Sequence, residues 1–163
     1  MRLFSHLFAT PAHRVFPEDS LHRIADAIAE GERRHRGEVM FAVESELSMS
    51  QVLRGVQARE RAQDAFARLR TWDTEANNGV LIYLLLADHR IEIVADRGLE
   101  GKVNPEQWRG VCLLMEEHLR SGDPEKAVAQ GVQAVSDLLA VHFPQREGEP
   151  DEDELPNLPR ILD

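Results

Sequence analysis

Hydrophobic residues gather in three short runs that predict the strands of one sheet. Residues 80–86 (VLIYLLL) form the most apolar run of the chain, and residues 39–43 (VMFAV) form a second one. A continuous apolar run of this length is typical of a strand covered on both faces, so 80–86 is predicted to be central. Residues 90–95 (RIEIVA) alternate in part and follow a short turn at 87–89, which predicts an antiparallel hairpin with the central strand.

Apolar residues at helical spacing predict about four helices around these strands, in residues 17–36, 51–70, 105–121 and 124–143. Asn104-Pro105 and Asp123-Pro124 each combine a capping residue with a proline at the first helical position. The predicted order is therefore α-β-α-β-β-α-α. This order predicts an α/β fold, a single three-layer-like sandwich in which a small mixed β-sheet is flanked by about four helices.

The composition changes toward both ends of the chain, which divides it into three parts. We expect an N-terminal extension at 1–15, the α/β domain at 16–144 and an acidic tail containing proline and leucine at 145–163. The tail has seven acidic residues and two arginines, which gives it a formal charge of −5. Such a segment is too polar to bury itself, although its leucine and isoleucine side chains could bind in a groove.

The N-terminal residues 1–9 (MRLFSHLFA) are mildly apolar, but Ser5 and His6 interrupt them. The run is too short for a signal peptide or a membrane span, so we expect a cytoplasmic protein with peripheral membrane association at most. The apolar side chains of this segment are expected to dock on the domain's own surface, with a weak role at a membrane interface as the alternative. They are Leu3, Phe4, Leu7 and Phe8.

Length, charge and cysteine content exclude several classes of protein. The chain has 163 residues, of which 42% are hydrophobic, enough for one domain with a real core. Its net charge of −10 argues against a broad nucleic-acid surface. Cys112 is the single cysteine, so no intrachain disulfide can form, and its place on the apolar side of helix 105–121 predicts a small buried hydrophobe.

Oxygen-bearing side chains lie in two loops at one end of the predicted hairpin. One loop precedes strand 80–86 and the other follows strand 90–95, and because the hairpin brings these points together, the loops are expected to meet. Ca²⁺ and Mg²⁺ bind several such oxygens, so the loops predict a divalent-cation site, with solvated or capping carboxylates as the alternative. The predicted ligands are Asp73, Glu75, Asn77, Asp96 and Glu100, and Asp88 lies at the turn of the hairpin.

Arg59 is the unusual residue of the predicted helix 51–70. At 100° per residue it shares a direction with Val52 and Phe66, whereas Arg61 points to the opposite side. We therefore expect Arg61 on a solvated face and Arg59 near the sheet or its rim. There Arg59 would contact an anion or pair with a site carboxylate; a side chain that extends its charged group to water is the alternative.

Two segments resemble the TPM-domain family. Residues 72–82 (WDTEANNGVLI) resemble its signature, in which a tryptophan and a polar loop lead into an Asp-Asn-Gly-Val-Leu strand. Residues 91–101 (IEIVADRGLEG) are similar to the family's strand that ends in Gly-Tyr-Gly-Leu-Glu-Gly. The resemblance extends over residues 16–143 and is to the bacterial, single-domain form. It implies an α/β sandwich; the best-known members are thylakoid-lumen proteins linked to photosystem repair, with a proposed phosphatase activity, and some relatives bind calcium.

The sequence leaves two hypotheses for function. It has no G-x-S-x-G, P-loop, dinucleotide fingerprint or H-E-x-x-H motif. The first hypothesis is therefore an accessory or protein-interaction module of TPM type, with an unknown protein partner, no nucleic acid, and a Ca²⁺ or Mg²⁺ ion in the strand-end loops. The alternative is a cation-dependent phosphatase-like hydrolase that uses the same carboxylates, with the metal polarising a phosphoryl oxygen and Arg59 steadying the anion.

Overall fold

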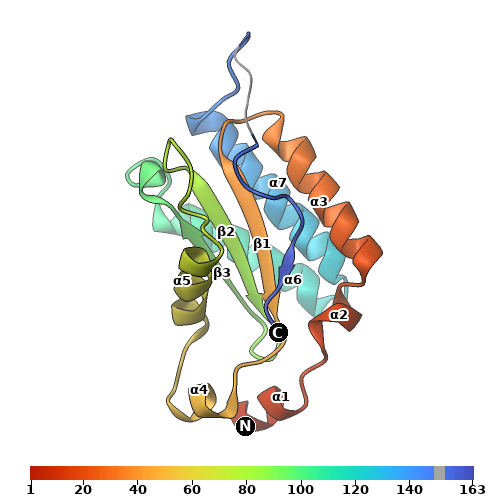
Figure 1. Ribbon diagram of the computed structural model, residues 1–163. Helices are drawn as coiled ribbons and strands as arrows, with labels where there is room; N and C mark the ends of the chain where they lie inside the picture. Colours follow the sequence, from red (N-terminus) through yellow and green to blue (C-terminus); the bar gives the residue numbers. More distant parts are fainter. Residues whose placement is uncertain (149–152) are drawn as a thin grey trace.

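Four strands form one mixed sheet in the computed structural model, which describes residues 1–148 and 153–163. β1 runs parallel to β2 and to β4, and β2 and β3 form the predicted antiparallel hairpin. Every residue of β1 and β2 is buried, as expected for the two inner strands of the sheet (Figure 1). The order is β3-β2-β1-β4, with β1 at Glu38–Glu44, β2 at Gly79–Leu85, β3 at Arg90–Ala95 and β4 at Arg160–Ile161.

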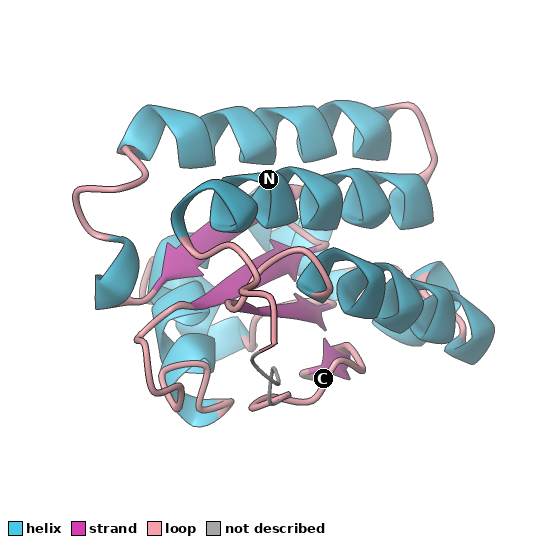
Figure 2. Ribbon diagram, turned by 90° about the horizontal axis from the view of Figure 1, so that it is seen from above, coloured by secondary structure: helices cyan, strands magenta, loops and turns pink. Residues whose placement is uncertain are grey.

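Helices cover both faces of this sheet, which confirms the predicted α/β sandwich (Figure 2). Helices α3 (Glu18–Glu32), α6 (Pro105–Arg120) and α7 (Pro124–His142) cover one face, and α5 (Ala58–Arg68) lies on the other. Successive strand residues contribute to opposite cores, since Phe41 packs in the first core and Met40 in the second. No helix in residues 1–148 and 153–163 is long and apolar enough to cross a membrane.

The helix predicted over 51–70 is two helices, because a glycine ends the first one. Helix α4 (Met49–Leu53) begins at Ser48, whose side chain accepts a hydrogen bond from the backbone of Gln51. Gly55 then adopts a φ of 75°, in the region that glycine enters without steric cost. The chain changes direction there before α5 begins.

Both ends of the chain fold against the domain. At the N-terminus, α1 (Arg2–Leu7) and α2 (Ala12–Val15) precede α3. Beyond residues 149–152 of the predicted tail, which lie outside the described residues, the chain crosses the sheet (Figure 1). Leu155 is buried in the core on the α5 side, and the backbone N–H of Leu162 donates to the carbonyl of Val43 at 2.9 Å. This C-terminal segment (residues 153–163) therefore adds β4 to the outer edge of β1.

A substitution of Gly98 tests how closely the loops at one end of the sheet approach each other. A Cβ at Gly98 would lie 2.4 Å from the backbone carbonyl oxygens of both Ala76 and Asn77, which cannot rotate away as a side chain could. We expect Gly98→Ala to lower the free energy of unfolding by about 2–3 kcal/mol, measured by urea denaturation. The control is Gly110→Ala in α6, where an added Cβ would meet nothing within 4 Å beyond the adjoining backbone of its own helix, and alanine should add up to about 1 kcal/mol. Equal stability of the two variants would contradict this account.

Candidate functional site

The two loops that were expected to meet at the end of the hairpin are in direct contact. The backbone N–H of Gly98 donates to the carbonyl of Asn77 at 2.8 Å, and that of Asp96 donates to the carbonyl of Gly79 at 2.9 Å. Asn77 has a positive φ of 51°, which turns the first loop toward the second. The backbone thus holds the predicted ligand loops side by side, where β2 begins and β3 ends.

The side chains of the predicted ligands have separate local roles in the structure. Asp73 pairs with Arg70 at 2.9 Å, and Asp96 accepts from the backbone of Arg97 at 2.8 Å. Glu75 and Glu100 are exposed, although the backbone N–H of Glu75 donates to a carboxylate of the C-terminal segment. Whether these loop residues bind a metal stays a prediction.

A different group of acidic side chains converges beside these loops. Glu32 ends α3, Glu38 begins β1 and Asp153 starts the C-terminal segment. One carboxylate oxygen from each lies within 4.8 Å of the others. We call these three residues the acidic cluster. Because carboxylates at this spacing repel one another, the arrangement favours either a bound cation or a retained proton.

Glu38 is the buried member of the acidic cluster, with 2% of its surface exposed. Its Oε1 accepts a hydrogen bond from the backbone N–H of Glu154 at 2.9 Å, whereas its Oε2 is buried without a hydrogen-bond partner among the described residues. Burial, followed by repulsion from Glu32, raises the pKa of Glu38 to about 9. Glu38 therefore carries a proton at neutral pH unless a cation replaces it.

Two more buried acceptor oxygens belong to residues that adjoin the strands at this end of the sheet. The side-chain oxygen of Asn78, directly before β2, and Oδ2 of Asp96, directly after β3, are buried without a partner in the described part of the chain. The backbone N–H of Glu38 donates to the carbonyl of Asn78 at 3.3 Å, so Asn78 adjoins the start of β1. Unpaired acceptors without matching donors are a feature that cation binding can relieve.

The opposite end of the sheet contrasts with this one, because its carboxylates are paired. Arg61 binds Glu44 through two hydrogen bonds of 2.7 and 3.2 Å, and the hydroxyl of Tyr83 donates to Glu44 at 2.5 Å. Burial, followed by this hydrogen bond to Glu44, raises the pKa of Tyr83 far above its usual range. The network is typical of a buried ion pair that supports the fold.

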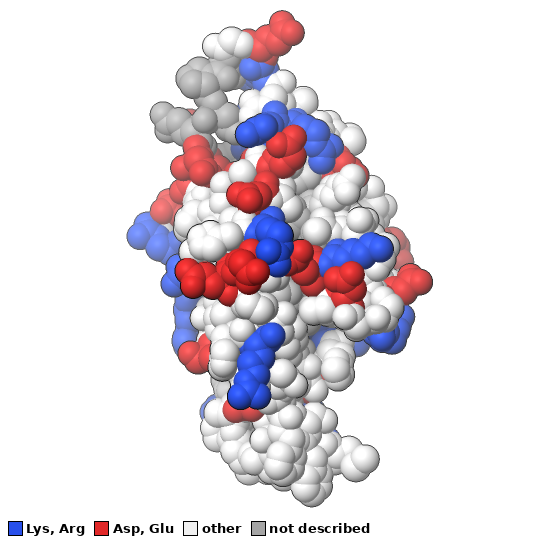
Figure 3. Space-filling view, turned by 90° about the vertical axis from the view of Figure 1, so that its right-hand side faces the viewer, with Lys and Arg blue, Asp and Glu red and all other residues white. Residues whose placement is uncertain are grey.

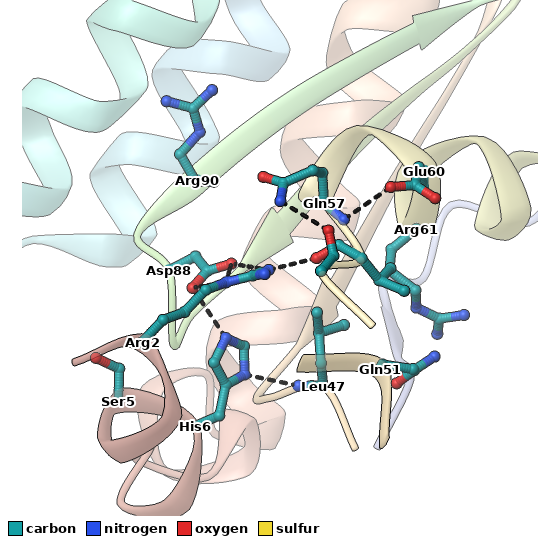
Figure 4. Close-up of polar contacts among 12 residues, drawn as sticks. Arg2, Ser5, His6, Leu47, Gln51, Gln57, Glu60, Arg61, Asp88 and Arg90 are labelled. Atoms are coloured by element: carbon teal, nitrogen blue, oxygen red, sulfur yellow. Dashed lines mark hydrogen bonds and ion pairs between the residues drawn. The ribbon is translucent and has the colours of Figure 1, made fainter. Parts of the chain in front are cut away.

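Asp88 lies at this paired end and not beside the predicted ligand loops (Figure 4). Arg2 binds it at 2.8 Å, and Nε2 of His6 lies 2.9 Å from its Oδ1. Burial alone would raise the pKa of Asp88, but the hydrogen bonds from Arg2 and His6 outweigh it and the pKa is lowered. Asp88 thus fastens the N-terminal helix α1 to the hairpin turn.

The helical wheel placed Arg59 at the edge of the sheet, where the structure has it, but it wrongly placed Arg61 on a solvated face. Arg61 is the buried arginine, while Arg59 is half exposed, donates to the carbonyl of Ile93 at 2.5 Å and lies 3.6 Å from Glu92. The wheel took its direction from larger apolar residues, whereas the side of α5 that packs on the sheet consists of alanines 58, 62 and 65. With the alanines against the sheet, Arg61 lies within hydrogen-bond distance of Glu44.

Arg59 borders an open groove of about 470 Å³ between α5, β3 and α6. Trp108 and Cys112 line the same groove, and burial raises the pKa of the Cys112 thiol to about 12, so the thiolate is not formed at neutral pH. The contact from Arg59 to Ile93 covers part of the free edge of β3, which protects an edge strand from pairing with other chains.

The acidic cluster was missed at the sequence level because its members are far apart in the chain. Glu32 lies near the end of an amphipathic helix, directly before the basic residues 33–36, and reads as part of a solvated, charged last turn. Glu38 gave the one available signal, since it adjoins the apolar run 39–43 on the side of a buried strand. Asp153 could not be assigned, because nothing in the sequence indicated where the tail would dock.

Comparison with known proteins gives the same fold and one family. Residues 11–138 match the TPM domain family. The BA42 protein from the psychrophilic bacterium Bizionia argentinensis is similar in structure, with a TM-score of 0.76 and 26% identity over 88% of this chain and 92% of that one. The N-terminal domain of a protein from P. gingivalis has a TM-score of 0.60 and 19% identity over 81% and 83% of the two chains, a likeness of fold. The comparison with curated proteins found no match.

The raised pKa of Glu38 predicts how the stability of the metal-free protein depends on pH. Between pH 4.5 and 9 the folded state retains a proton that the unfolded state releases, so raising the pH through this window favours unfolding. Glu38→Gln cannot release that proton. In EDTA, we expect the wild type to lose stability relative to Glu38→Gln as the pH rises from 7 to 9. The difference between their free energies of unfolding should change by at most about 1.4 kcal/mol per pH unit.

Urea denaturation across that range measures this difference. The range lies above the titration of His35, whose pKa burial lowers to about 4. Glu75→Gln, at an exposed position, is the control and should follow the wild type. A constant offset between Glu38→Gln and the wild type at every pH would show that Glu38 is already ionised when the protein is folded.

Proposed function

The chain belongs to the TPM-domain family, and from this premise we propose that it is an accessory module controlled by a divalent cation. In this proposal the acidic cluster of Glu32, Glu38 and Asp153 binds Ca²⁺ or Mg²⁺, and the ion holds the C-terminal segment against the sheet. The observation that carries the proposal is the Oε2 atom of Glu38. It is a buried carboxylate oxygen without a donor in the described residues, within a group of three carboxylates whose oxygens lie within 4.8 Å.

The chemistry of the acidic cluster suits a hard cation. Ca²⁺ and Mg²⁺ take oxygen ligands, and three carboxylates together with water can supply a coordination shell. Burial and then repulsion from Glu32 raise the pKa of Glu38; an ion at this point would offset both and would displace the proton. Cation affinity should therefore increase as the pH rises toward 9.

The position of Asp153 connects the cation to the C-terminal segment. The next residue, Glu154, donates its backbone N–H to Glu38 and accepts one from Glu75, each at 2.9 Å. Farther along, Leu155 is buried and β4 pairs with β1. An ion that binds Asp153 to Glu32 and Glu38 thus fixes the start of the segment, and the later contacts close it over the edge of β1.

The docked segment also determines how a protein partner could bind. The leucine-containing tail contacts its own domain, which favours a closing role over direct capture of a partner by the tail. When the cation leaves, Glu38 takes up a proton and Asp153 loses its link through the ion to Glu32 and Glu38, which loosens the segment and exposes the outer edge of β1. A partner protein can then add a strand at that edge, the mode of recognition known as β-augmentation.

Calorimetric titration with Ca²⁺ and with Mg²⁺ tests the cation site. We expect saturable binding to the wild type at pH 8, a loss of at least about tenfold in affinity in Glu38→Gln and in Asp153→Asn, and a weaker affinity at pH 6.5. The pH effect follows because the proton on Glu38 competes with the ion.

Matched variants distinguish this site from the ligand loops predicted from sequence. Asp73→Asn and Asp96→Asn remove the same charge nearby and should keep the wild-type affinity. If Asp73→Asn and Asp96→Asn lose binding and Glu38→Gln retains it, the ion binds in the loops and not in the acidic cluster. Absence of binding to the wild type at millimolar concentrations of either ion would refute the proposal.

Amide hydrogen exchange tests whether the ion holds the C-terminal segment. We expect Ca²⁺ to slow exchange in peptides that cover residues 153–163 of the wild type by severalfold, because opening of the segment must break the ion contacts. Peptides from α6 serve as the internal reference. Exchange that Ca²⁺ leaves unchanged in the tail, although calorimetry shows binding, would separate cation binding from closure of the segment.

The phosphatase-like hydrolase remains the alternative, and the placement of Arg59 does not favour it. Arg59 was the residue expected to steady a phosphate, but it contacts Ile93 and Glu92 on β3. Hydrolysis of a generic phosphate monoester by the wild type, abolished in Glu38→Gln, would nevertheless support that alternative.

A further inference from the structure

The N-terminal helix α1 turns its polar side toward the protein and its apolar side toward solvent. His6 is 2% exposed, and its Nδ1 accepts a hydrogen bond from the backbone N–H of Leu47 at 2.9 Å, while Nε2 contacts Asp88 (Figure 4). Arg2 binds Asp88 and also donates to the carbonyl of Val56 at 2.5 Å. This orientation is the reverse of the amphipathic helices that cover a soluble core.

The outward side of α1 presents large apolar residues. Phe4 is 61% exposed, Leu7 51% and Phe8 79%, so the expectation that this segment docks through its apolar side chains is wrong for these three residues. The polar anchor explains the difference, because Arg2 and His6 already occupy the contact surface with the domain. The energy of that contact therefore comes from hydrogen bonds and an ion pair, and the apolar residues are left for another contact.

Helix α4 extends the same apolar surface. It contacts α1, and both short helices lie at one extremity of the molecule (Figure 1). Leu53 of α4 is 74% exposed. We call this surface the apolar end, and it consists of Met1, Phe4, Leu7, Phe8, Met49 and Leu53. An exposed group of this size marks an interaction site.

The charge around the apolar end indicates what it binds. Residues 1–17 and 47–57, which build it, contain Arg2, Arg14 and Arg54 and neither Asp nor Glu, a formal charge of +3, and Glu18 and Glu46 adjoin the two ranges. Arg2 is paired with Asp88, so Arg14 and Arg54 carry the remaining positive charge. The whole chain carries −10, so the remaining residues carry −13. The space-filling view shows that the lower end is almost free of charged side chains, whereas both acidic and basic groups cover the rest of that face (Figure 3).

We propose that the apolar end binds the surface of a lipid bilayer that contains anionic headgroups. Phe4, Phe8 and Leu53 enter the boundary between headgroups and acyl chains, as the apolar residues of interfacial helices do. Arg14 and Arg54, both exposed, contact the headgroups. The acidic cluster and the start of the C-terminal segment lie at the other extremity of the molecule, away from the negative surface (Figure 1). The absence of acidic residues from 1–17 and 47–57 favours an anionic lipid surface over the strongly acidic surface of a second copy.

Sedimentation with vesicles tests this proposal on the full chain. We expect the protein to pellet with vesicles of phosphatidylcholine mixed with phosphatidylglycerol, and less with phosphatidylcholine alone or at high salt. The double variant Phe4→Ser/Phe8→Ser should lower the partition coefficient about tenfold or more, because two interfacial rings are lost. Arg14→Glu/Arg54→Glu should lower binding to the anionic vesicles and leave binding to phosphatidylcholine alone unchanged.

A matched control removes apolar surface elsewhere. Leu113 on α6 is 52% exposed and Val141 on α7 is 72% exposed, so Leu113→Ser/Val141→Ser changes a comparable surface and should bind like the wild type. Thermal melts should show all variants folded, since each changed side chain is exposed. No binding by the wild type, or equal losses in both serine variants, would overturn the proposal. So would a lipid-free dimer that Phe4→Ser/Phe8→Ser converts to monomer, because the apolar end would then join two copies.

Discussion

The central constraint in this structure is that its buried inner strand carries a carboxylate at each end. β1 is covered on both faces and paired on both sides, yet it begins at Glu38 and ends at Glu44, and both are buried. A buried carboxylate must find charged or hydrogen-bonding partners or remain protonated. The sequence supplies such partners fully at one end of β1 and incompletely at the other, and this difference gives the two ends of the molecule different properties.

At the end of β1, Arg61 and Tyr83 hydrogen-bond to Glu44, and nearby Arg2 and His6 hydrogen-bond to Asp88. Every one of these contacts joins segments distant in sequence, so together they fix α5, the hairpin turn and α1 to one another. At the start of β1, Glu38 receives a single backbone donor from the described residues, and two further acids, Glu32 and Asp153, lie beside it. The end of β1 is therefore held by paired side chains, whereas its start keeps acceptor oxygens that could bind a ligand.

The fold could be predicted from the sequence to a large extent, because the strands are short apolar runs and the helices begin at clear caps. The runs at 80–86 and 90–95 correspond closely to β2 and β3, and the Asn104 cap begins α6 as expected. The contact between the two loops also followed from the hairpin alone. The prediction of one helix over 51–70 was wrong at Gly55, because a glycine within a helical pattern is compatible with a continuous helix and with a helix that ends there.

The sites were harder to predict, because they depend on contacts between residues that are distant in the sequence. The acidic cluster takes one residue from α3, one from β1 and one from the C-terminal segment, so no spacing in the sequence reveals it. The role of Arg61 depended on which side of α5 packs on the sheet, and alanines gave a weaker pattern than valine and phenylalanine. Helix α1 is oriented by Arg2 and His6, whose common partner Asp88 lies more than eighty residues away. Hydrophobic periodicity cannot predict a helix that docks through its polar residues.

The C-terminal segment physically connects the two proposed sites. It starts at the acidic cluster and ends where Asp163 accepts hydrogen bonds from the backbone and the hydroxyl of Ser45. The same hydroxyl accepts the backbone N–H of Ala12 at 2.6 Å, at the start of α2 in the N-terminal region that carries the apolar end. A cation that holds the start of the segment therefore favours the contacts at its other end, and these support the region that would meet a bilayer. By linkage, any such coupling must act in both directions, so a lipid surface that orders the N-terminal region would also tighten cation binding.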